Sequence, residues 1–314
     1  MSVKRLFLSV GAMKAGTTFL FNAMSRHPDI YMTPEKELHF FAHVDGFSED
    51  LYRSDNYAGN LIRKLGLRDL YNRLTPDAMP RMGEILSMEF RRHRLSSVMH
   101  NRFAKIQDAD KLREIVRWYA DRYLTSPVDD AWFDRVYAAA GDRWAADFSN
   151  YNAVLSDAGW ERAKRLADEL KIIYMMREPT DRLWSHIKFD LIQSGRREEL
   201  DHLSADDVAR LLHNPAIVAH AQYARIVDNL KRHLRADQIL FLTLDQVTAD
   251  FVGQMRRIEQ FLGISSANYG NVDPTKKANA SEQRDMVAGV AEIINAAVLP
   301  EDRDTYEKAR DGLL

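Results

Sequence analysis

Three short apolar segments, far apart in the chain, limit the choice of fold more than any other feature. Residues 6–10, 172–176 and 239–244 are nearly all apolar, and each has the length of a strand that is buried on both faces. Between them, apolar residues return every three or four positions, as they do in helices that pack on one side. Strands that alternate with helices form right-handed crossovers and a parallel sheet. The sequence therefore predicts an α/β fold, a parallel sheet flanked by helices.

Weaker strand signals lie at residues 29–32 and 144–148. The periodic segments predict helices at residues 17–26, 160–170, 182–193, 216–234 and 251–262. In open parallel sheets, ligands bind at the carboxyl ends of the strands. Functional residues are therefore expected directly after positions 10, 32, 176 and 244.

Length and charge narrow the class of protein. The chain has 314 residues, with 44 Lys and Arg against 46 Asp and Glu, and no Cys. This length suits one large domain, and a near-neutral charge argues against non-specific nucleic-acid binding. Without Cys, thiolate nucleophiles and sulfur-ligated zinc or iron sites are excluded. We expect a single domain over residues 1–314, in which residues 46–131, where the strand–helix alternation breaks, form a helical insertion.

The first residues could be read as a signal peptide, because Lys4 and Arg5 precede a short apolar run. Cleavage after that run would cut into the glycine-rich loop that follows it, so a strand of the mature protein is the favoured interpretation. The sequence contains no stretch of the roughly 20 apolar residues that a membrane span needs. We therefore expect a cytoplasmic protein without a membrane span.

Residues 11–18, Gly-Ala-Met-Lys-Ala-Gly-Thr-Thr, join the first predicted strand to a helix. Such a loop offers backbone N–H groups and a helix N-terminus to an anion, and glycine lets the backbone approach closely. The spacing of Gly11 and Gly16 is that of the nucleotide-triphosphate loop G-x-x-x-x-G-K-[ST], but Lys14 precedes the second glycine instead of following it. With the lysine here, the loop resembles the 5′-phosphosulfate loop of sulfotransferases that use 3′-phosphoadenosine 5′-phosphosulfate (PAPS).

The resemblance implies a role for each residue of this loop. Lys14 would stabilise the departing 3′,5′-diphosphate. The 5′-phosphosulfate would be bound by Ala15, Gly16, Thr17 and Thr18.

A second segment, residues 173–185, is similar to the 3′-phosphate signature of the same family. It is an apolar strand that ends in Arg177, followed by an acid–Pro turn and a helix with Ser185 eight residues after the arginine. A guanidinium at a strand end can offer a bidentate fork to a phosphate, and Pro179 suits the first turn of a helix. The resemblance implies that Arg177 and Ser185 bind the 3′-phosphate of PAPS.

A third segment, residues 34–41, has the sequence Pro-Glu-Lys-Glu-Leu-His-Phe-Phe. It resembles the Lys-Glu-x-His-Phe-Phe motif of glycan-modifying sulfotransferases and many bacterial relatives. This implies Glu37 as the general base, with His39 orienting it or replacing it. His39 and His43 are also spaced as metal ligands on a helix, but a Glu of the H-E-x-x-H type and a third ligand are lacking, so no metal is expected.

The resemblance covers about residues 2–42 and 131–279. Near its end, Lys276 and Lys277 lie where relatives close over the 3′-phosphate with basic residues. One departure is Asp-Phe-Ser-Asn at residues 147–150, where many relatives have a Glu-x-Thr-Pro turn. Such departures affect the predicted acceptor site more than the predicted donor site.

The predicted insertion could form a lid over the acceptor. A basic run that includes Arg91, Arg92 and Arg94 would suit a carbohydrate or an anionic acceptor, and so would nearby aromatic side chains. Aromatic stripes more often belong to a core, however, and basic runs to a solvated helix face. The aromatic residues in question are Tyr52, Tyr57, Trp118, Tyr119, Tyr123 and Trp132.

Together these features predict a sulfotransferase with PAPS as co-substrate. Its acceptor would be a hydroxyl, less readily an amine, of a glycan, a lipid or a small molecule. A rival from another class is a kinase or ATPase that uses ATP and magnesium, with Asp245 after an apolar strand as the metal ligand. A third alternative is a nucleotide-binding module without activity.

Overall fold

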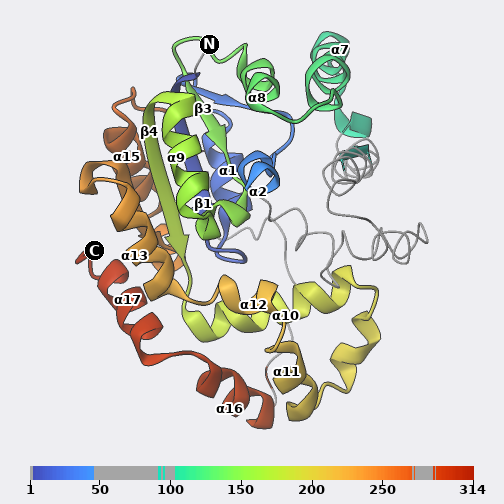
Figure 1. The fold of residues 1–314 in the computed structure, drawn as a ribbon, viewed down its shortest axis with the longest axis vertical. Coiled ribbons are helices and arrows are strands. Elements are labelled where there is room, and N and C mark those ends of the chain that lie inside the picture. The colour runs from blue at the N-terminus through green and yellow to red at the C-terminus, as the bar shows by residue number, and fades with distance from the viewer. Residues whose placement is uncertain are drawn as a thin grey trace.

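One five-stranded sheet of parallel strands, in the order β2-β3-β1-β4-β5, lies at the centre of the computed structural model (Figure 1). The structure describes residues 3–45, 91, 92, 95, 103–270, 272, 286 and 288–314. The strands are β1 (Val3–Gly11), β2 (Ile30–Met32), β3 (Trp144–Asp147), β4 (Ala167–Met176) and β5 (Ile239–Thr243). The predicted α/β class, the parallel sheet and the five strand positions are confirmed.

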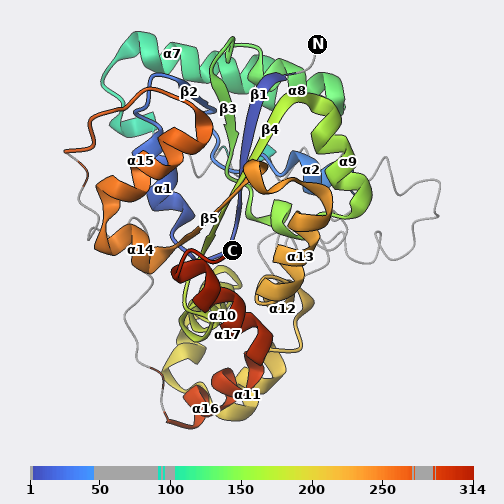
Figure 2. The ribbon, with the colours of Figure 1, turned by 90° about the vertical axis from the view of Figure 1, so that its left-hand side faces the viewer.

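Helices connect the strands and cover both faces of the sheet (Figures 1 and 2). They are α1 (Thr17–Met24), α2 (Phe40–Val44), α7 (Ala109–Trp118), α8 (Asp130–Tyr137), α9 (Asp157–Leu166), α10 (Pro179–Gln193), α11 (Ala205–Leu211), α12 (Pro215–Ala219), α13 (Tyr223–His233), α14 (Leu244–Ala249), α15 (Phe251–Leu262), α16 (Ala288–Ala297) and α17 (Pro300–Arg310). Short 3-10 helices occur at Phe103–Lys105, Asn150–Val154, Arg197–Asp201 and Ala236–Gln238, and a π-helical turn at Tyr119–Tyr123. Within the described residues, no helix combines the length and the apolar character needed to span a bilayer.

Several predicted boundaries differ from the structure, and in three cases the observed element is of another type or is divided. The helix predicted over residues 160–170 ends at Leu166, because the backbone from Ala167 onward is extended and pairs with β1. The helix predicted over residues 216–234 is two helices, α12 and α13. The strand predicted to residue 244 ends at Thr243, whose side chain caps α14.

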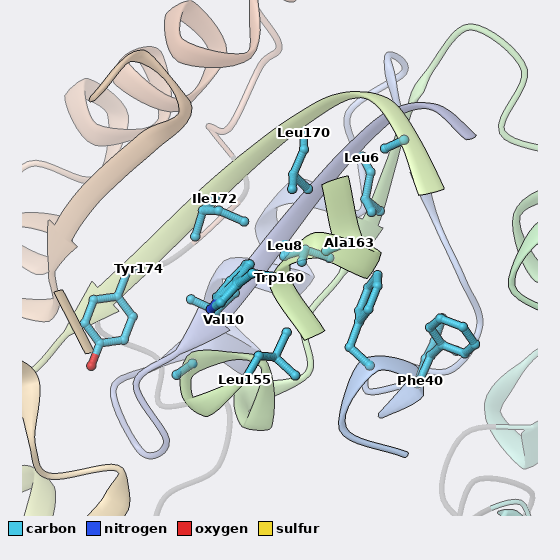
Figure 3. Close-up of a cluster of buried hydrophobic side chains, with 14 of the residues drawn as sticks. Leu6, Leu8, Val10, Phe40, Leu155, Trp160, Ala163, Leu170, Ile172 and Tyr174 are labelled. Carbon is cyan, nitrogen blue, oxygen red and sulfur yellow. The ribbon is translucent and has the colours of Figure 1, made fainter. Parts of the chain in front are cut away.

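The sheet separates two apolar cores, since successive residues of a strand face opposite sides. In β1, Leu8 and Val10 face the core under α8, α9 and α13, whereas Phe7 faces the core under α1 and α15. Figure 3 shows the first of these cores, where Ile172 of β4 and Trp160 of α9 pack beside β1. Each fully buried side chain of this size contributes about 1.5–3 kcal/mol. This burial fixes the strand ends and therefore the loops that follow them.

A third apolar cluster lies beyond the carboxyl end of the sheet, where α16 packs against α10 and α11 (Figure 2). Polar contacts tie the start of α10 to the last helices of the chain. Thr180 Oγ1 donates a hydrogen bond to Asn295 Oδ1 at 3.0 Å, and Arg303 forms an ion pair with Glu178 at 3.4 Å. The start of α10, the helix that follows β4, is thus anchored to α16 and α17.

The described part of the predicted insertion contributes to the core. Of the aromatic residues considered for the acceptor lid, the described ones have side chains at most 6 % exposed, and they are Trp118, Tyr119, Tyr123 and Trp132. Arg91 is 3 % exposed, donates to the carbonyl oxygens of Tyr123 and Thr125, and lies over the Trp132 ring. These residues therefore have the structural role that was the alternative to an acceptor lid. Tyr52, Tyr57 and Arg94 lie outside the described residues.

Candidate active site

The glycine-rich loop of residues 11–18, called the phosphate loop after its predicted role, leaves the carboxyl end of β1 and leads into α1. Gly16 is the N-cap of α1 with a left-handed φ of 92°, and a Cβ at this position would lie 2.9 Å from Leu244 Cδ1. Glycine satisfies both conditions. Lys14 is left-handed as well, with φ 68°. In the described part of the chain no side chain caps α1, so its first N–H groups, those of Thr17 and Thr18, can serve an anion.

Lys14 belongs to a cluster of positive charge. Burial, followed by the nearby charge of Arg177 and then those of Lys36 and Lys188, lowers the pKa of Lys14 to about 8, while Glu37 acts in the opposite direction. Four cations around one carboxylate repel each other and favour a ligand with several negative charges. The site is therefore suited to a polyanion.

Arg177 directly follows β4, and Ser185 lies in the second turn of α10. The Arg177 side chain is 27 % exposed and forms an ion pair with Asp181 at 3.1 Å. Ser185 is buried. The Lys14 ammonium lies 4.3 Å from the centroid of the Phe189 ring, also in α10, so α10 runs beside the phosphate loop. An ion pair between partly exposed residues is weak, so Arg177 can exchange Asp181 for a phosphate at small cost.

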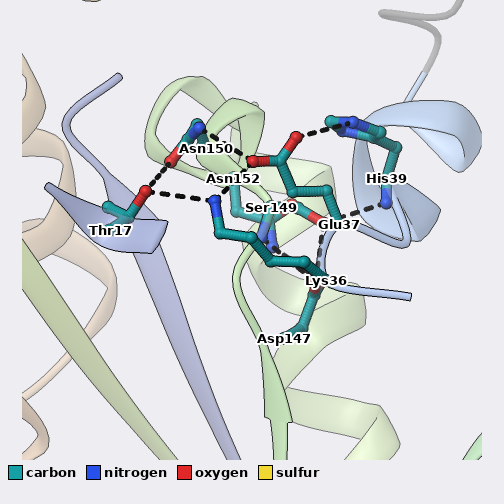
Figure 4. A network of polar contacts seen from close by, with 8 residues as sticks. All are labelled: Thr17, Lys36, Glu37, His39, Asp147, Ser149, Asn150 and Asn152. Carbon is teal, nitrogen blue, oxygen red and sulfur yellow. Dashed lines mark hydrogen bonds and ion pairs between the residues drawn. The ribbon is translucent and has the colours of Figure 1, made fainter. Parts of the chain in front are cut away.

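Glu37 is the centre of a polar network (Figure 4). Its Oε1 accepts hydrogen bonds from Lys36 Nζ at 2.7 Å and from Asn150 Nδ2 at 3.2 Å. Its Oε2 lies 3.5 Å from His39 Nε2. Lys36 Nζ and Asn150 Oδ1 also contact Thr17 Oγ1, at 3.2 and 3.3 Å. The predicted base and the phosphate loop are thus side by side.

The turn after β3 supports this network. Asp147 Oδ1 accepts hydrogen bonds from the N–H and the hydroxyl of Ser149, at 3.1 and 2.6 Å, and Oδ2 accepts one from Asn152 at 3.1 Å. Ser149 Oγ accepts from the His39 N–H at 2.9 Å. Burial raises the pKa of Asp147, and the hydrogen bonds from Ser149 and Asn152 act against that rise. The turn therefore fixes the backbone that carries His39.

Two predicted donor-binding groups are already engaged within the protein. The N–H of Ala15 donates to Ala12 O at 3.1 Å, so this amide is used inside the loop. The Thr17 hydroxyl bonds to Asn150. Lys276 and Lys277 lie outside the described residues. The predicted residues at this edge of the sheet are Lys14, Gly16, Thr17, Thr18, Glu37, His39, Arg177 and Ser185.

Sequence reasoning assigned no role to Lys36 and Asn150. Lys36 directly precedes the candidate base in the motif of residues 34–41, and this adjacency is the sequence signal that points to it. Asn150 appeared only as a departure from the family pattern. Its signal was position, since it follows a predicted strand whose carboxyl end belongs to the same edge of the sheet.

The aspartate of the alternative kinase prediction has a partner within the protein. Asp245 lies in α14 and accepts a hydrogen bond from Tyr306 Oη at 2.5 Å, so it has a structural partner. Among the described residues, no three His, Asp or Glu side chains are grouped as ligands of a metal ion.

Comparisons with known proteins agree with this geometry. The model of the sulfotransferase family matches residues 7–268, which is most of the chain. The chain therefore belongs to the sulfotransferase family. No curated protein sequence gives a significant match.

Two solved structures share the fold at a TM-score of 0.50 or above. The sulfotransferase from Alicyclobacillus acidocaldarius is 19 % identical, with a TM-score of 0.51 over 97 % of this chain and 96 % of that chain. The sulfotransferase domain from the curacin biosynthetic pathway is 11 % identical, with a TM-score of 0.50 over 99 % and 98 % of the two chains. The sulfotransferase domain from the Synechococcus PCC 7002 olefin synthase is 17 % identical, with a TM-score of 0.48 over 99 % and 94 %.

Proposed function

We propose that this sulfotransferase moves the sulfuryl group of PAPS to a hydroxyl of a glycan, a lipid or a small molecule. The observation that carries the proposal is the contact between the candidate base and the phosphate loop. Glu37 shares Lys36 and Asn150 with Thr17, so a proton acceptor stands beside the loop that would hold the donor. Transfer between two substrates requires such closeness.

The donor would be bound by backbone N–H groups, hydroxyls and cations around the loop. The cation cluster suits a nucleotide with phosphates at both ends of its ribose, and Gly16 leaves room where a Cβ would collide with Leu244. The residues proposed to bind the donor are Lys14, Gly16, Thr17, Thr18, Arg177, Ser185, Lys276 and Lys277. The Ala15 amide is left out, because Ala12 already uses it.

The reaction requires a base and a group that stabilises the leaving phosphate. PAPS supplies a sulfuryl group on a phosphate that leaves readily. Glu37 accepts the proton of the acceptor hydroxyl while the hydroxyl oxygen bonds to sulfur and the bond from sulfur to the 5′-phosphate oxygen breaks. The Lys14 ammonium neutralises the charge that develops on that oxygen, and His39 orients Glu37. The products are the sulfated acceptor and adenosine 3′,5′-bisphosphate.

Transfer of radiolabelled sulfate from PAPS to panels of glycans, phenols, lipids and aliphatic alcohols tests the proposal. We expect transfer to one of these classes, with kcat reduced at least ~100-fold in Lys14→Met and in Glu37→Gln. Lys308→Met, an exposed lysine paired with Asp304 on α17, is the matched control and keeps wild-type activity. Near-wild-type transfer by Lys14→Met would contradict the role of that lysine.

Nucleotide binding separates the rivals. Adenosine 3′,5′-bisphosphate without magnesium should raise the Tm of the wild type, and ATP with magnesium should not. The opposite result would favour the kinase. Binding of the bisphosphate with no transfer to any acceptor would favour a binding module.

A further inference from the structure

Four side chains beside the phosphate loop close into a ring of hydrogen bonds (Figure 4). Lys36 donates to Glu37 Oε1 at 2.7 Å and to Thr17 Oγ1 at 3.2 Å. Asn150 donates to Glu37 Oε1 at 3.2 Å, and Thr17 donates to Asn150 Oδ1 at 3.3 Å. The residues come from the start of α1, the loop after β2 and the turn after β3. The ring therefore joins the carboxyl-end loops of three strands at one point.

Donor and acceptor chemistry lets the ring close in one direction. Lys36 can only donate, and an ionised Glu37 can only accept. The Asn150 amide must therefore turn its NH2 group to Glu37, which leaves its carbonyl oxygen to accept the single hydroxyl proton of Thr17. All four bonds are satisfied when Glu37 carries its negative charge.

The ring is shielded from water, which strengthens bonds to a charged group. The side chains of Lys36 and Glu37 are 14 % and 19 % exposed, and Thr17 and Asn150 are buried. Asn150 is held in place by its own turn, because Asp147 binds the neighbouring Ser149. An ammonium with three rotatable donors fixes a carboxylate poorly, and His39 Nε2 faces the other oxygen, Oε2, at 3.5 Å, so the second donor on Oε1 fixes the position of that oxygen.

We propose that Asn150 is a positioning residue, whose amide keeps Glu37 ionised and aimed relative to the phosphate loop. The charged and titratable groups that face Glu37 are Lys36, Lys14 and His39, and Asn150 is the neutral donor that fixes Oε1. The inference rests on the proposed function for the meaning of Glu37 as a base. The bonds of the ring do not depend on that function, so the two can be tested separately.

Titration of Glu37 by NMR, with glutamate labelled with ¹³C at the carboxyl carbon, provides the test. The signal is assigned by its loss in Glu37→Gln. In Asn150→Ala we expect the midpoint of the Glu37 titration to move up by about one pH unit, because the ionised form has lost a donor. Asn150→Ser, which is too short to span Glu37 and Thr17, should behave in the same way and serves if the alanine variant does not fold.

Asn152→Ala is the matched control. It removes the same type of side chain from the same turn, but the lost bond goes to Asp147. We expect it to lower the Tm and to leave the Glu37 midpoint unchanged. An unshifted midpoint in Asn150→Ala, or an equal shift in Asn152→Ala, overturns the positioning role.

A kinetic readout supplements the titration. With PAPS and an accepted substrate, the acidic limb of kcat/KM in Asn150→Ala should move to higher pH by the same amount as the titration midpoint. A limb that stays in place while the rate falls would mean a purely structural effect. Absence of transfer by the wild type would reject the proposed function alone, since the titration uses no donor.

Discussion

At the scale of single residues, the environment of Lys14 predicts the pH range in which the proposed site works. Burial and the neighbouring cations lower the pKa of this lysine to about 8, well below its usual value of 10.5. Below pH 8 the ammonium is charged and can stabilise a leaving phosphate. Above pH 8 the free protein loses that charge.

This environment predicts a basic limb in the pH profile. The value of kcat/KM for PAPS should fall as pH rises through about 8, because it reports the protonation of the free protein. Lys14→Arg keeps a cation of much higher pKa, so its limb should move beyond pH 10, at a reduced kcat. Initial rates between pH 6 and 10 provide the measurement. A limb at the same pH in both proteins would show that another group titrates.

At the scale of elements, long-range polar contacts mark the limit of prediction from sequence. The apolar runs predicted β1, β4 and β5, because a strand that is buried on both faces is a short and nearly continuous apolar segment. The phosphate loop followed from its glycines and its lysine. Asn150 could not be found in this way, because its partner Glu37 lies 113 positions away and nothing local to either residue encodes the bond. The prediction that the helix continues past Leu166 was wrong for the same reason, because long-range pairing with β1 makes the backbone from Ala167 onward extended.

The neighbouring arginines 91 and 92 test the structural role found for the basic run. Arg91 is buried and bonded to the carbonyl oxygens of Tyr123 and Thr125, whereas Arg92 is exposed. Arg91→Ala should lower the free energy of unfolding by about 2–4 kcal/mol, because it removes the hydrogen bonds of a buried guanidinium to two carbonyl groups and its packing on aromatic rings. Arg92→Ala should change it by less than about 0.5 kcal/mol.

Urea unfolding of the two variants measures both effects. Equal losses of stability would contradict the distinction between a core arginine and a surface arginine. A rise in the KM for the acceptor in Arg92→Ala alone would instead support the prediction that the basic run binds the acceptor.

At the scale of the whole molecule, buried histidines make the fold sensitive to acid. Burial, together with the charge of Arg91 for His43 and of Arg182 for His220, lowers the pKa to about 4 in His43 and about 3 in His220. Burial lowers the pKa of His186 as well. Neither ring nitrogen of His220 has a hydrogen-bond partner in the described part of the chain. His43 and His220 are therefore neutral in the folded protein at pH 6.

The sign of the pH effect follows from these shifts. Below the ordinary histidine pKa of about 6.5, the unfolded chain binds protons that the folded protein refuses, so acid favours unfolding. Between pH 6.5 and about 4, His43 and His220 should each remove up to ~1.4 kcal/mol of stability per pH unit. Urea unfolding at pH 7 and pH 5.5 measures this loss, and His43→Phe should make it smaller. Equal stability at both pH values would contradict the burial of these rings.

The polar contacts at the start of α10 connect the last helices, α16 and α17, to the candidate site, to which neither helix contributes a predicted residue. Glu178 and Thr180, which follow Arg177, are anchored by Arg303 and Asn295. Both anchors lie after residue 268, where the family match ends. A protein shortened to residues 7–268 would retain Lys14, Glu37 and the whole arginine signature. It would lose Asn295 and Arg303, which hold the start of α10. For this protein, we therefore expect the span of the family match to be shorter than the span on which the candidate site depends.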